Sequence, residues 1–400
     1  MSQQDIVIVG GARTAMAEFV GTPGYGLFKD LSANELGGLA IAGALERSGV
    51  AAERIDHVVM GNALQTSADA LYGARHSALK AGIPIEVPAL TVNRLCGSGM
   101  QSVVSAAHMI LAGEAEVCVA GGMENMSQAP HVIRGAREGI KFGLPPKLED
   151  SLFASLLDTH CGLFMAQTAE KLAARFGIGR EEQDEFALRS HRLGAAAVQN
   201  GVFAEEIVPV TVRRGRREVV VDTDDHIKPD TSLEALQKLR PAFGKDGTVT
   251  AGNASGIVDG AAALIVTTPA RAEAEGWTVR ARVRSWGIAG VEPSEMGFGP
   301  VPAIRQALER ARLGLDEIDF FEINEAFSAQ YLAVEKALEL DRDKVNVNGG
   351  AVAIGHPLGA TGTRLVLTLI HQLERTGKRY GMASACIGGG QGIAVLVERA

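Results

Sequence analysis

Short runs of β-branched and small apolar residues alternate with longer amphipathic runs along most of the chain. This alternation predicts an α/β fold, because helices that lie between strands in the sequence cover the faces of a sheet. Helices are expected at 31–48, 303–311, 326–338 and 361–375. Strands are expected at 6–9, 57–60, 117–120, 262–267, 279–283, 319–323, 345–348, 380–386 and 392–397.

The same order of features occurs twice along the chain. The turn LCGSGMQS at 95–102 precedes a helix and the strand EVCVAGG at 116–122. Far along the chain, NGGAVAIGHPLGATGTR at 348–364 precedes a helix and the segment GMASACIGGG at 381–390. Each copy closes on an apolar strand, DGAAALIVTT or GIAVLVER. We therefore predict two similar, doubly wound halves of βαβ type.

The segment between these halves, residues 123–249, has a different composition. It contains methionines, prolines, a long charged helix at 180–199 and a basic cluster at 213–217. We expect it to be an inserted loop domain. The two halves then comprise 1–122 together with 250–275, and 276–400.

The overall charge and the cysteine spacing exclude several classes of protein. The 400 residues carry 39 Lys and Arg against 47 Asp and Glu, a net charge of −8, which argues against a nucleic-acid binder. No apolar run approaches the ~20 residues of a membrane span, and no secretory signal is visible. The four cysteines form no CxxC pair, so neither a disulfide scaffold nor a metal site is expected. We expect a cytoplasmic protein, with the mitochondrial matrix as the alternative in a eukaryote.

Cys96 lies in the stretch NRLCGSGMQ, at the junction between an expected strand and an expected helix. Backbone N–H groups and the helix dipole favour negative charge there, which is expected to lower the pKa of the thiol and make it a nucleophile. The glycines after it let a substrate approach the backbone. The alternative role for a free cysteine is a small buried hydrophobe, and Cys96 alone does not separate the two.

Three further polar residues lie at similar junctions. His356 lies in a glycine-rich turn before Pro357 and is expected to be uncrowded. Cys386 ends a strand before three glycines, whose N–H groups can stabilise an oxyanion. Asn324 follows a strand in EINEAF, where its amide can orient a water or polarise a carbonyl. Because strand ends line the ligand crevice of an open α/β sheet, we expect these side chains to converge with Cys96.

Two thiols and an imidazole suit carbon–carbon bond exchange at a thioester. One thiolate takes the acyl group covalently with histidine as its base, and a second acid or base moves a proton at the acetyl methyl carbon. Oxyanion donors are needed twice, once for the tetrahedral intermediate and once for the enolate.

The motifs NRLCGSGMQ, GNASG, EINEAF, GGAVAIGHPLGATGTR and SACIGGGQGIAV resemble those of the thiolases, in order and almost end to end. The resemblance implies a thiolase fold, layered αβαβα with an inserted loop domain, assembled as a homodimer or homotetramer. It implies that Cys96 forms the acyl-enzyme, that His356 activates it, and that Cys386 handles the proton on the acetyl carbon. Asn324, through a water, and His356 would hold the thioester oxygen. The backbone N–H groups of Cys96 and Gly388 would form the other oxyanion hole.

The resemblance also implies that coenzyme A and acetyl-CoA are substrates and that no cofactor is permanently bound. Ser255 of GNASG is expected near the pantetheine. Lys228 stands where many thiolases have an arginine near the adenine, and a lysine lacks its planar stacking. The basic cluster at 213–217 either helps there or, as we favour, forms a solvated hairpin. Apolar lining is expected from Leu156, Met165, Phe243, Met296 and Phe327.

Two sequence features bear on the length of the acyl chain that the substrate carries. Thiolases restricted to acetoacetyl-CoA commonly carry His-Met in the loop domain, where this chain has Phe164 and Met165. The segment KLEDSL at 147–152 resembles the 3-ketoacyl-CoA thiolases of fatty-acid breakdown. We therefore favour an acyltransferase for short to medium 3-oxoacyl-CoA substrates. An acetoacetyl-CoA-specific, biosynthetic acetyl-CoA acetyltransferase is the alternative.

Other interpretations fit the residues less well. A decarboxylating ketoacyl synthase is expected to have a histidine where Cys386 stands. A papain-like protease leaves the internal repeat and the second cysteine without a role. An inactive lipid-binding or scaffold relative is disfavoured by the intact polar residues. A regulatory disulfide between Cys96 and Cys386 is compatible with catalysis.

Overall fold

A computed structural model describes residues 5–400, so residues 1–4 of the predicted first half lie outside the described residues. The core is a ten-stranded mixed sheet in the order β14-β15-β16-β13-β1-β12-β5-β3-β4, with β2 paired to β12. Its strands are β1 (Ile6–Arg13), β2 (Ala17–Glu18), β3 (His57–Gly61), β4 (Ala89–Val92), β5 (Cys118–Glu124), β12 (Val258–Thr267), β13 (Ala281–Gly290), β14 (Phe320–Ile323), β15 (Tyr380–Ile387) and β16 (Gln391–Arg399).

The helices lie between and around these strands. They are α1 (Ala33–Ser48), α2 (Gly73–Lys80), α3 (Ser98–Leu111), α4 (Ser151–Ser155), α5 (Met165–Phe176), α6 (Arg180–Gln199), α7 (Leu233–Gln237), α8 (Pro269–Glu275), α9 (Pro300–Ala311), α10 (Ser328–Leu338), α11 (Ala351–Ile354) and α12 (Leu358–Thr376). No helix within residues 5–400 is both long and apolar enough to cross a membrane.

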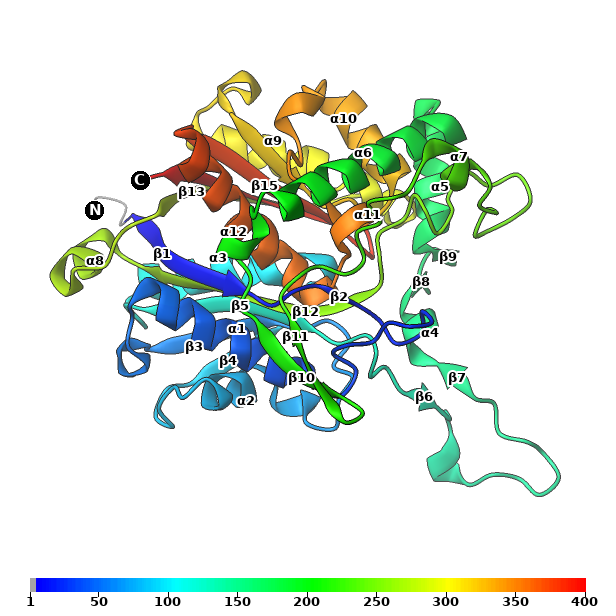
Figure 1. Cartoon of the computed structure of the whole chain (residues 1–400), viewed down its shortest axis with the longest axis horizontal. Helices are drawn as coiled ribbons and strands as arrows, with labels where there is room; N and C mark the ends of the chain where they lie inside the picture. The colour runs from blue at the N-terminus through cyan, green and yellow to red at the C-terminus, as the bar shows by residue number, and fades with distance from the viewer. Residues whose placement is uncertain (1–4) are drawn as a thin grey trace.

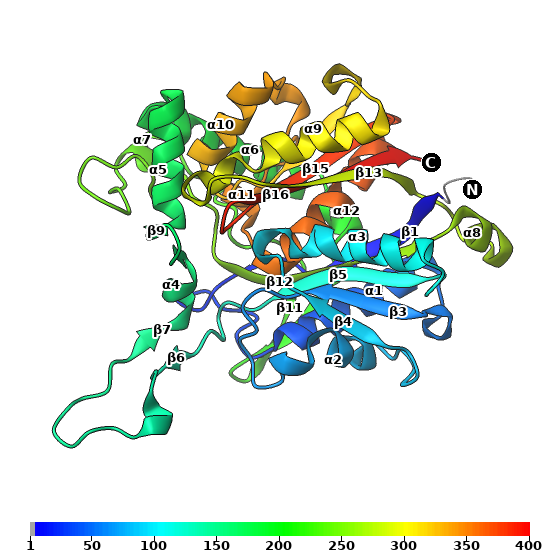
Figure 2. The ribbon, with the colours of Figure 1, turned by 180° about the vertical axis from the view of Figure 1, so that it is seen from behind.

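The sheet consists of two wings that join at β1 and β13 through a short antiparallel pairing. Helices α3 and α12 pack between the wings (Figures 1 and 2). Helices α1 and α2 cover the outer face of one wing, and α9 and α10 cover the outer face of the other. The resulting order of layers is αβαβα, which confirms the predicted fold class.

The two central helices approach each other closely where each begins. A Cβ atom on Gly99 of α3 would lie 2.5 Å from the backbone nitrogen of Thr363 on α12, so only glycine fits there. Helix α12 is buried around most of its circumference, as expected for a helix with a sheet on either side. The turns that precede α3 and α12 are therefore brought together at one place.

The internal repeat is visible in the topology, with one exception. The expected strand at 345–348 is wrong, because the segment makes one parallel bridge from Val345 to Phe321 and then turns. Asn346 adopts a positive φ of 46°, and its side-chain amide bonds both the N–H and the C=O of Ile323 at 2.9 Å. The Asn346 side chain thus makes the two hydrogen bonds to Ile323 that the backbone of a continuing strand would make. In the other wing, β4 pairs in full with β3 at the corresponding position.

The long excursion between β5 and β12 leaves and re-enters the sheet at two paired strands. It includes the two-stranded pairs β6 (His131–Val132) with β7 (Glu149–Asp150), β8 (Leu157–Asp158) with β9 (Leu163–Phe164), and β10 (Val210–Arg214) with β11 (Arg217–Val221). The arginines of the basic cluster are exposed on the β10–β11 hairpin, which confirms the solvated hairpin.

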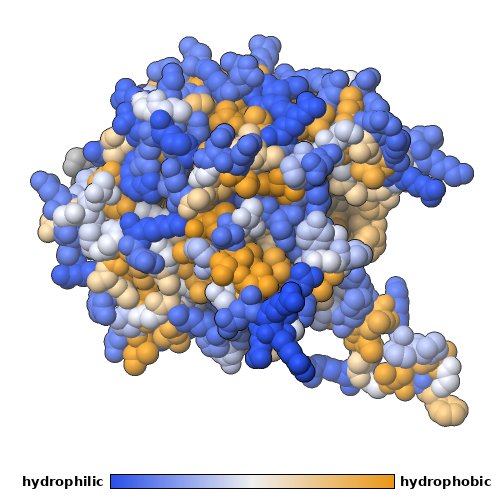
Figure 3. All heavy atoms as spheres, in the orientation of Figure 1, coloured by the Kyte–Doolittle hydropathy of each residue, from blue (hydrophilic) through white to orange (hydrophobic). Residues whose placement is uncertain are grey.

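An arm between β6 and β7 projects from the body and carries apolar side chains (Figure 3). Its exposed residues include Ile140, Phe142, Leu144 and Leu148.

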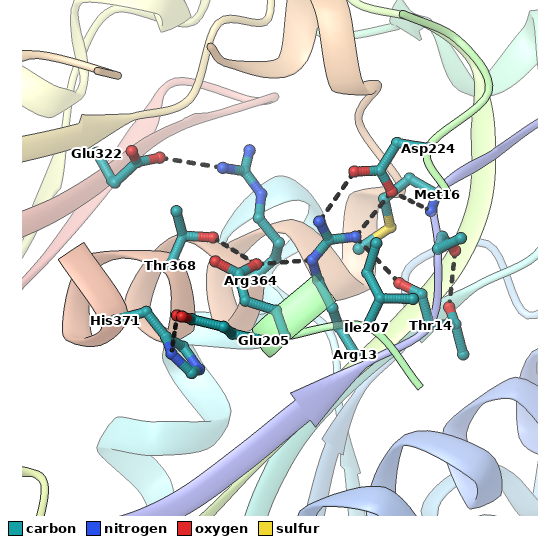
Figure 4. Close-up of polar contacts among 12 residues, drawn as sticks. Arg13, Thr14, Met16, Glu205, Ile207, Asp224, Glu322, Arg364, Thr368 and His371 are labelled. Carbon is teal, nitrogen blue, oxygen red and sulfur yellow. Dashed lines mark hydrogen bonds and ion pairs between the residues drawn. The ribbon is translucent and has the colours of Figure 1, made fainter. Parts of the chain in front are cut away.

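Buried polar side chains link this excursion to the core (Figure 4). The Arg13 Nε on β1 donates to Glu206 Oε2 at 2.8 Å, and its two terminal nitrogens donate to Asp224 at 2.7 and 2.9 Å. The Thr368 hydroxyl on α12 donates to the same Glu206 oxygen at 3.0 Å. These charge-assisted bonds join β1, the excursion and α12.

We expect Arg13→Met to lower the free energy of unfolding by about 3–5 kcal/mol, because Glu206 and Asp224 would stay buried without their cation. Urea unfolding followed by circular dichroism measures the loss. Arg134→Met is the matched control, because Arg134 pairs with Glu149 on the exposed arm, and no measurable change is expected there. Equal free energies of unfolding for the two variants would contradict the claim that the buried network stabilises the fold.

Candidate active site

The turn that carries Cys96 joins β4 to α3, as predicted. Residues Leu95–Gly97 form a single 3₁₀ turn, and α3 begins at Ser98. The Ser98 hydroxyl closes this turn, since it accepts from Arg94 N at 2.8 Å and donates to Leu95 O at 2.7 Å. Leu95 has a φ of 45°, a conformation that is uncommon outside glycine. The turn leaves Cys96 partly exposed.

Cys386 lies at the end of β15, where that strand pairs with β16, and it is fully buried. Burial raises the pKa of its thiol well above the ordinary value, and negative charge on Cys96 raises it further. The two turns also touch beside the thiols, since a Cβ on Gly97, next to Cys96, would lie 2.5 Å from Cδ1 of Ile387, next to Cys386. Gly388, two residues beyond Cys386, lies against Leu95 and Met165. The hairpin end and the Cys96 turn therefore form one site.

The expected lowering of the pKa of Cys96 is wrong. Burial raises the pKa of this thiol to about 11, although the backbone N–H groups of Gly388 and of Cys96 itself act in the opposite direction. Negative charge on Glu124 adds to the increase. Desolvation thus outweighs the dipoles of the turn, and a base has to remove the proton when the thiol reacts.

His356 is suited to be that base, although it is buried rather than uncrowded as predicted. Its Nδ1 lies 2.6 Å from the Thr361 hydroxyl, which itself donates to Pro357 O at 3.1 Å. Because the hydroxyl has a single proton, it must accept from His356 Nδ1–H, which leaves the Nε2 lone pair as a hydrogen-bond acceptor. Burial and the positive charge of Arg364 lower the pKa of His356 to about 3, so the imidazole is neutral and able to accept a proton.

Asn324 lies beside that lone pair. The end of β14 holds its backbone, because Asn324 N donates to Ser384 O at 2.9 Å. Its side-chain Nδ2 lies 3.3 Å from His356 Nε2, and both groups are buried. Asn324 Oδ1 is buried without a hydrogen-bond partner among residues 5–400. The amide and the imidazole thus present polar atoms to the same point.

The segment GNASG fastens the turns of the site to one another. Ser255 N donates to Ala326 O at 3.0 Å, next to the Asn324 turn, and His356 N donates to Gly256 O at 2.9 Å. Met296 and Ala326 are buried against Cys386, with Met165 and Phe327 packed on the same cluster. Three of the five predicted lining residues, Met165, Met296 and Phe327, therefore surround the second thiol.

The two other predicted lining residues, Leu156 and Phe243, lie next to this cluster through Met165 and Phe164, whereas the predicted lysine is bound elsewhere. Phe243 stacks on Phe164 with ring centroids 5.1 Å apart, and Leu156 O accepts from Met165 N at 2.9 Å. The ammonium group of Lys228 contacts Glu18 at 3.0 Å and the Tyr25 hydroxyl at 2.6 Å. A phosphate at Lys228 would have to compete with the Glu18 carboxylate.

Comparison with known proteins identifies the family. Residues 6–270 match the thiolase N-terminal domain and residues 277–399 match the thiolase C-terminal domain. The chain belongs to the thiolase family. Human mitochondrial 3-ketoacyl-CoA thiolase is 51% identical over 373 residues, which cover 93% of this chain and 94% of the human protein. The acetyl-CoA acetyltransferase of Cupriavidus necator is 47% identical over 396 residues, 99% of each chain.

A crystal structure of human mitochondrial 3-ketoacyl-CoA thiolase in complex with CoA has a TM-score of 0.95 to this chain. It is 49% identical and covers 100% of this thiolase and 98% of its own chain. The predictions of the thiolase family, its fold and the acyltransferase class are confirmed. The protease and ketoacyl synthase interpretations are accordingly set aside.

The sequence interpretation of this thiolase missed Thr361. Its hydroxyl orients His356 and selects the imidazole tautomer. The position carries a usable signal, because a threonine one turn into the helix after His-Pro can bond both the histidine and the Pro357 carbonyl. The sequence does not show that the contact between the Thr361 hydroxyl and the His356 ring forms, because this contact requires the whole turn to be buried.

Proposed function

We propose that this thiolase catalyses 3-oxoacyl-CoA + CoA = acyl-CoA + acetyl-CoA through an acyl intermediate on Cys96. The observation that carries this proposal is an imidazole oriented by Thr361 and Asn324 at a site where the turn of Cys96 touches the strand end of Cys386. Relatives that align along almost the whole chain are named as 3-ketoacyl-CoA thiolase or acetyl-CoA acetyltransferase.

In the cleavage direction, His356 Nε2 takes the proton of Cys96, and the sulfur attacks the 3-oxo carbon. The bond between C2 and C3 then breaks, and the enolate of acetyl-CoA takes the proton of Cys386 at its carbon. The high pKa of Cys386 favours this, because the thiol is protonated before the enolate forms. The thiol of CoA next attacks the acyl group and gives its proton to Cys386, while the imidazolium returns the first proton to Cys96.

Two sets of donors serve the two oxyanions. The backbone N–H groups of Cys96 and Gly388 point at the reacting sulfur, where they act on its pKa, and are assigned to the intermediate on Cys96. Asn324, through a water, and His356 are assigned to the thioester oxygen of the enolate. We place the pantetheine beside Ser255, and residues 123–249 are assigned to the loop domain that covers it.

We assign short to medium 3-oxoacyl chains as substrates. Phe153, Phe164 and Phe243 form an aromatic cluster with centroid separations of 4.8 and 5.1 Å, and Met165 directly follows Phe164. This apolar surface suits a chain longer than four carbons. We expect thiolysis of both acetoacetyl-CoA and 3-oxooctanoyl-CoA at comparable rates. Activity on the four-carbon substrate alone would support the biosynthetic alternative, and inactivity on both would support a scaffold role.

The surface supports a homodimer, and a homotetramer formed from two dimers. Strand β4 is the last in the sheet, and Leu90 on it and Ile85 just before it are exposed. Exposed edge strands with apolar side chains are covered in stable proteins. The projecting arm with Phe142 offers a second contact surface between subunits.

We assign the protein to the cytoplasm, where its four free cysteines stay reduced, with the mitochondrial matrix of the named human relative as the alternative.

A further inference from the structure

Glu124 is a buried carboxylate at the end of β5 that takes no part in the steps above. Its two oxygens accept four hydrogen bonds: from Asn62 Nδ2 at 2.9 Å, Ala63 N at 3.1 Å, Leu64 N at 3.1 Å and Gly359 N at 2.9 Å. All four partners are donors. The site therefore fits the ionised carboxylate, because a protonated oxygen would point a hydrogen at an N–H group.

One of these bonds reaches the turn of the proposed base. Gly359 lies in the first turn of α12, three residues after His356. The turn sits directly on the ends of β3 and β5, since a Cβ on Gly359 would lie 2.5 Å from Met123 O and 2.8 Å from Gly61 O. The Glu124 carboxylate thus holds the start of α12 at the strand ends.

The bond from Ala63 reaches the turn of the proposed nucleophile. Ala63, whose N–H is bound by Glu124, accepts through its carbonyl from Asn93 Nδ2 at 2.9 Å. Asn93 Oδ1 accepts in turn from Leu95 N at 2.9 Å, next to Cys96. A continuous path of hydrogen bonds therefore runs from Glu124 to the residue before the thiol.

We propose that Glu124 is a positioning residue that holds the Cys96 turn and the His356 turn in register for proton transfer between them. The proposal rests on the acyl-transfer function described above. Ionised Glu124 is required to satisfy all four donors: Oε2 accepts from Ala63 N and Gly359 N, and Oε1 accepts from Asn62 Nδ2 and Leu64 N, so a proton or an NH₂ group at either oxygen position would face two donors.

The ionisation of Glu124 gives the proposal a pH dependence. Burial raises its pKa to about 7, and the charge of Asp259 on β12 contributes to the increase. The other titratable groups near it are Cys96, whose pKa is about 11, and His356, whose pKa is about 3. Neither changes its protonation near neutrality, whereas burial raises the pKa of Asp259 to about 6. We expect activity to fall as the pH is lowered through about 7 and assign this acid limb to Glu124, because Asp259 contacts neither turn; the Asp259 variant below separates the two carboxylates.

Glu124→Gln keeps the size of the side chain but turns an NH₂ group toward the N–H donors. We expect kcat to fall about 100-fold, as for a misaligned pair of reacting groups, with KM for CoA unchanged. The acid limb near pH 7 should be absent from the pH profile of the variant. A kcat within a few-fold of the wild type, or a retained acid limb near pH 7, would overturn the proposal.

Asp259→Asn is the matched control. Asp259 is also a buried carboxylate, but it accepts from Met126 N, Ser127 N and the Ser127 hydroxyl and touches neither turn. Its variant should keep kcat at high pH and keep an acid limb, moved to lower pH because a negative charge near Glu124 is gone. Loss of the limb in both variants would overturn the assignment to Glu124.

If Glu124→Gln does not fold, Asn93→Ala tests the same path from its exposed end. We expect a lower kcat with unchanged KM, and an unchanged kcat would overturn the path. Acetyl-CoA treatment and mass spectrometry of the wild type separate this proposal from the proposed function. If the wild type forms no adduct on Cys96, the acyl-transfer function fails. If it forms one and the variants behave as wild type, only the role of Glu124 fails.

Discussion

Cys96→Ser is expected to abolish acyl transfer. A serine hydroxyl is far less acidic than a thiol, and this site makes ionisation harder still, because burial already raises the pKa of Cys96 to about 11. The proton of an alcohol is therefore much harder for His356 to remove than the proton of a thiol. We expect a loss of about 10⁴-fold or more in kcat, as for removal of other covalent nucleophiles. Mass spectrometry after incubation with acetyl-CoA should show no acetyl adduct.

Cys161→Ser provides the matched control for that experiment. Cys161 is also a partly exposed free cysteine, but it lies between β8 and β9, outside the turns that carry Cys96 and His356. This variant should acquire one acetyl group at the wild-type rate. An adduct that persists in Cys96→Ser and disappears in Cys161→Ser would show that the nucleophile had been misassigned.

The sequence was sufficient to predict the layers and the residues at strand ends, because both are encoded locally. Alternating apolar patterns mark strands and helices, and each catalytic candidate lies where one pattern gives way to another. Convergence of Cys96, Asn324, His356 and Cys386 then follows from topology, since the turns before α3 and α12 meet between the wings.

Features that depend on three-dimensional surroundings could not be predicted in this way. Asn346 replaces a strand by bonding Ile323 with its side chain, which local pattern does not reveal. The pKa of Cys96 was predicted from the dipoles of its turn, whereas the structure adds the desolvation that exceeds them. The resemblance predicts Lys228 near the adenine of CoA, but its ammonium group is bound by Glu18, which is distant in the chain. Each case depends on the groups that the fold brings around the residue.

Cys386→Ser is expected to separate the two halves of the reaction. Acylation uses Cys96 and His356 for the attack and Cys386 only to protonate the departing CoA, which as a thiolate is a good leaving group without that proton. The variant should therefore still acquire an acetyl group and still exchange labelled CoA with acetyl-CoA, although more slowly than the wild type. Condensation requires removal of a proton from the acetyl methyl, and a buried serine cannot act as that base. Acetoacetyl-CoA formation should therefore fall by about 10²- to 10⁴-fold, the usual contribution of a general acid or base.

The comparison of exchange with condensation isolates the step that depends on Cys386. Burial raises the pKa of Cys96 to about 11, so this thiol is neutral near pH 7 and its acylation removes no charge from beside Cys386. A loss confined to condensation therefore reports on proton transfer at the acetyl methyl and not on a change in the charge of Cys96. Condensation at the wild-type rate in Cys386→Ser would show that another group moves the methyl proton.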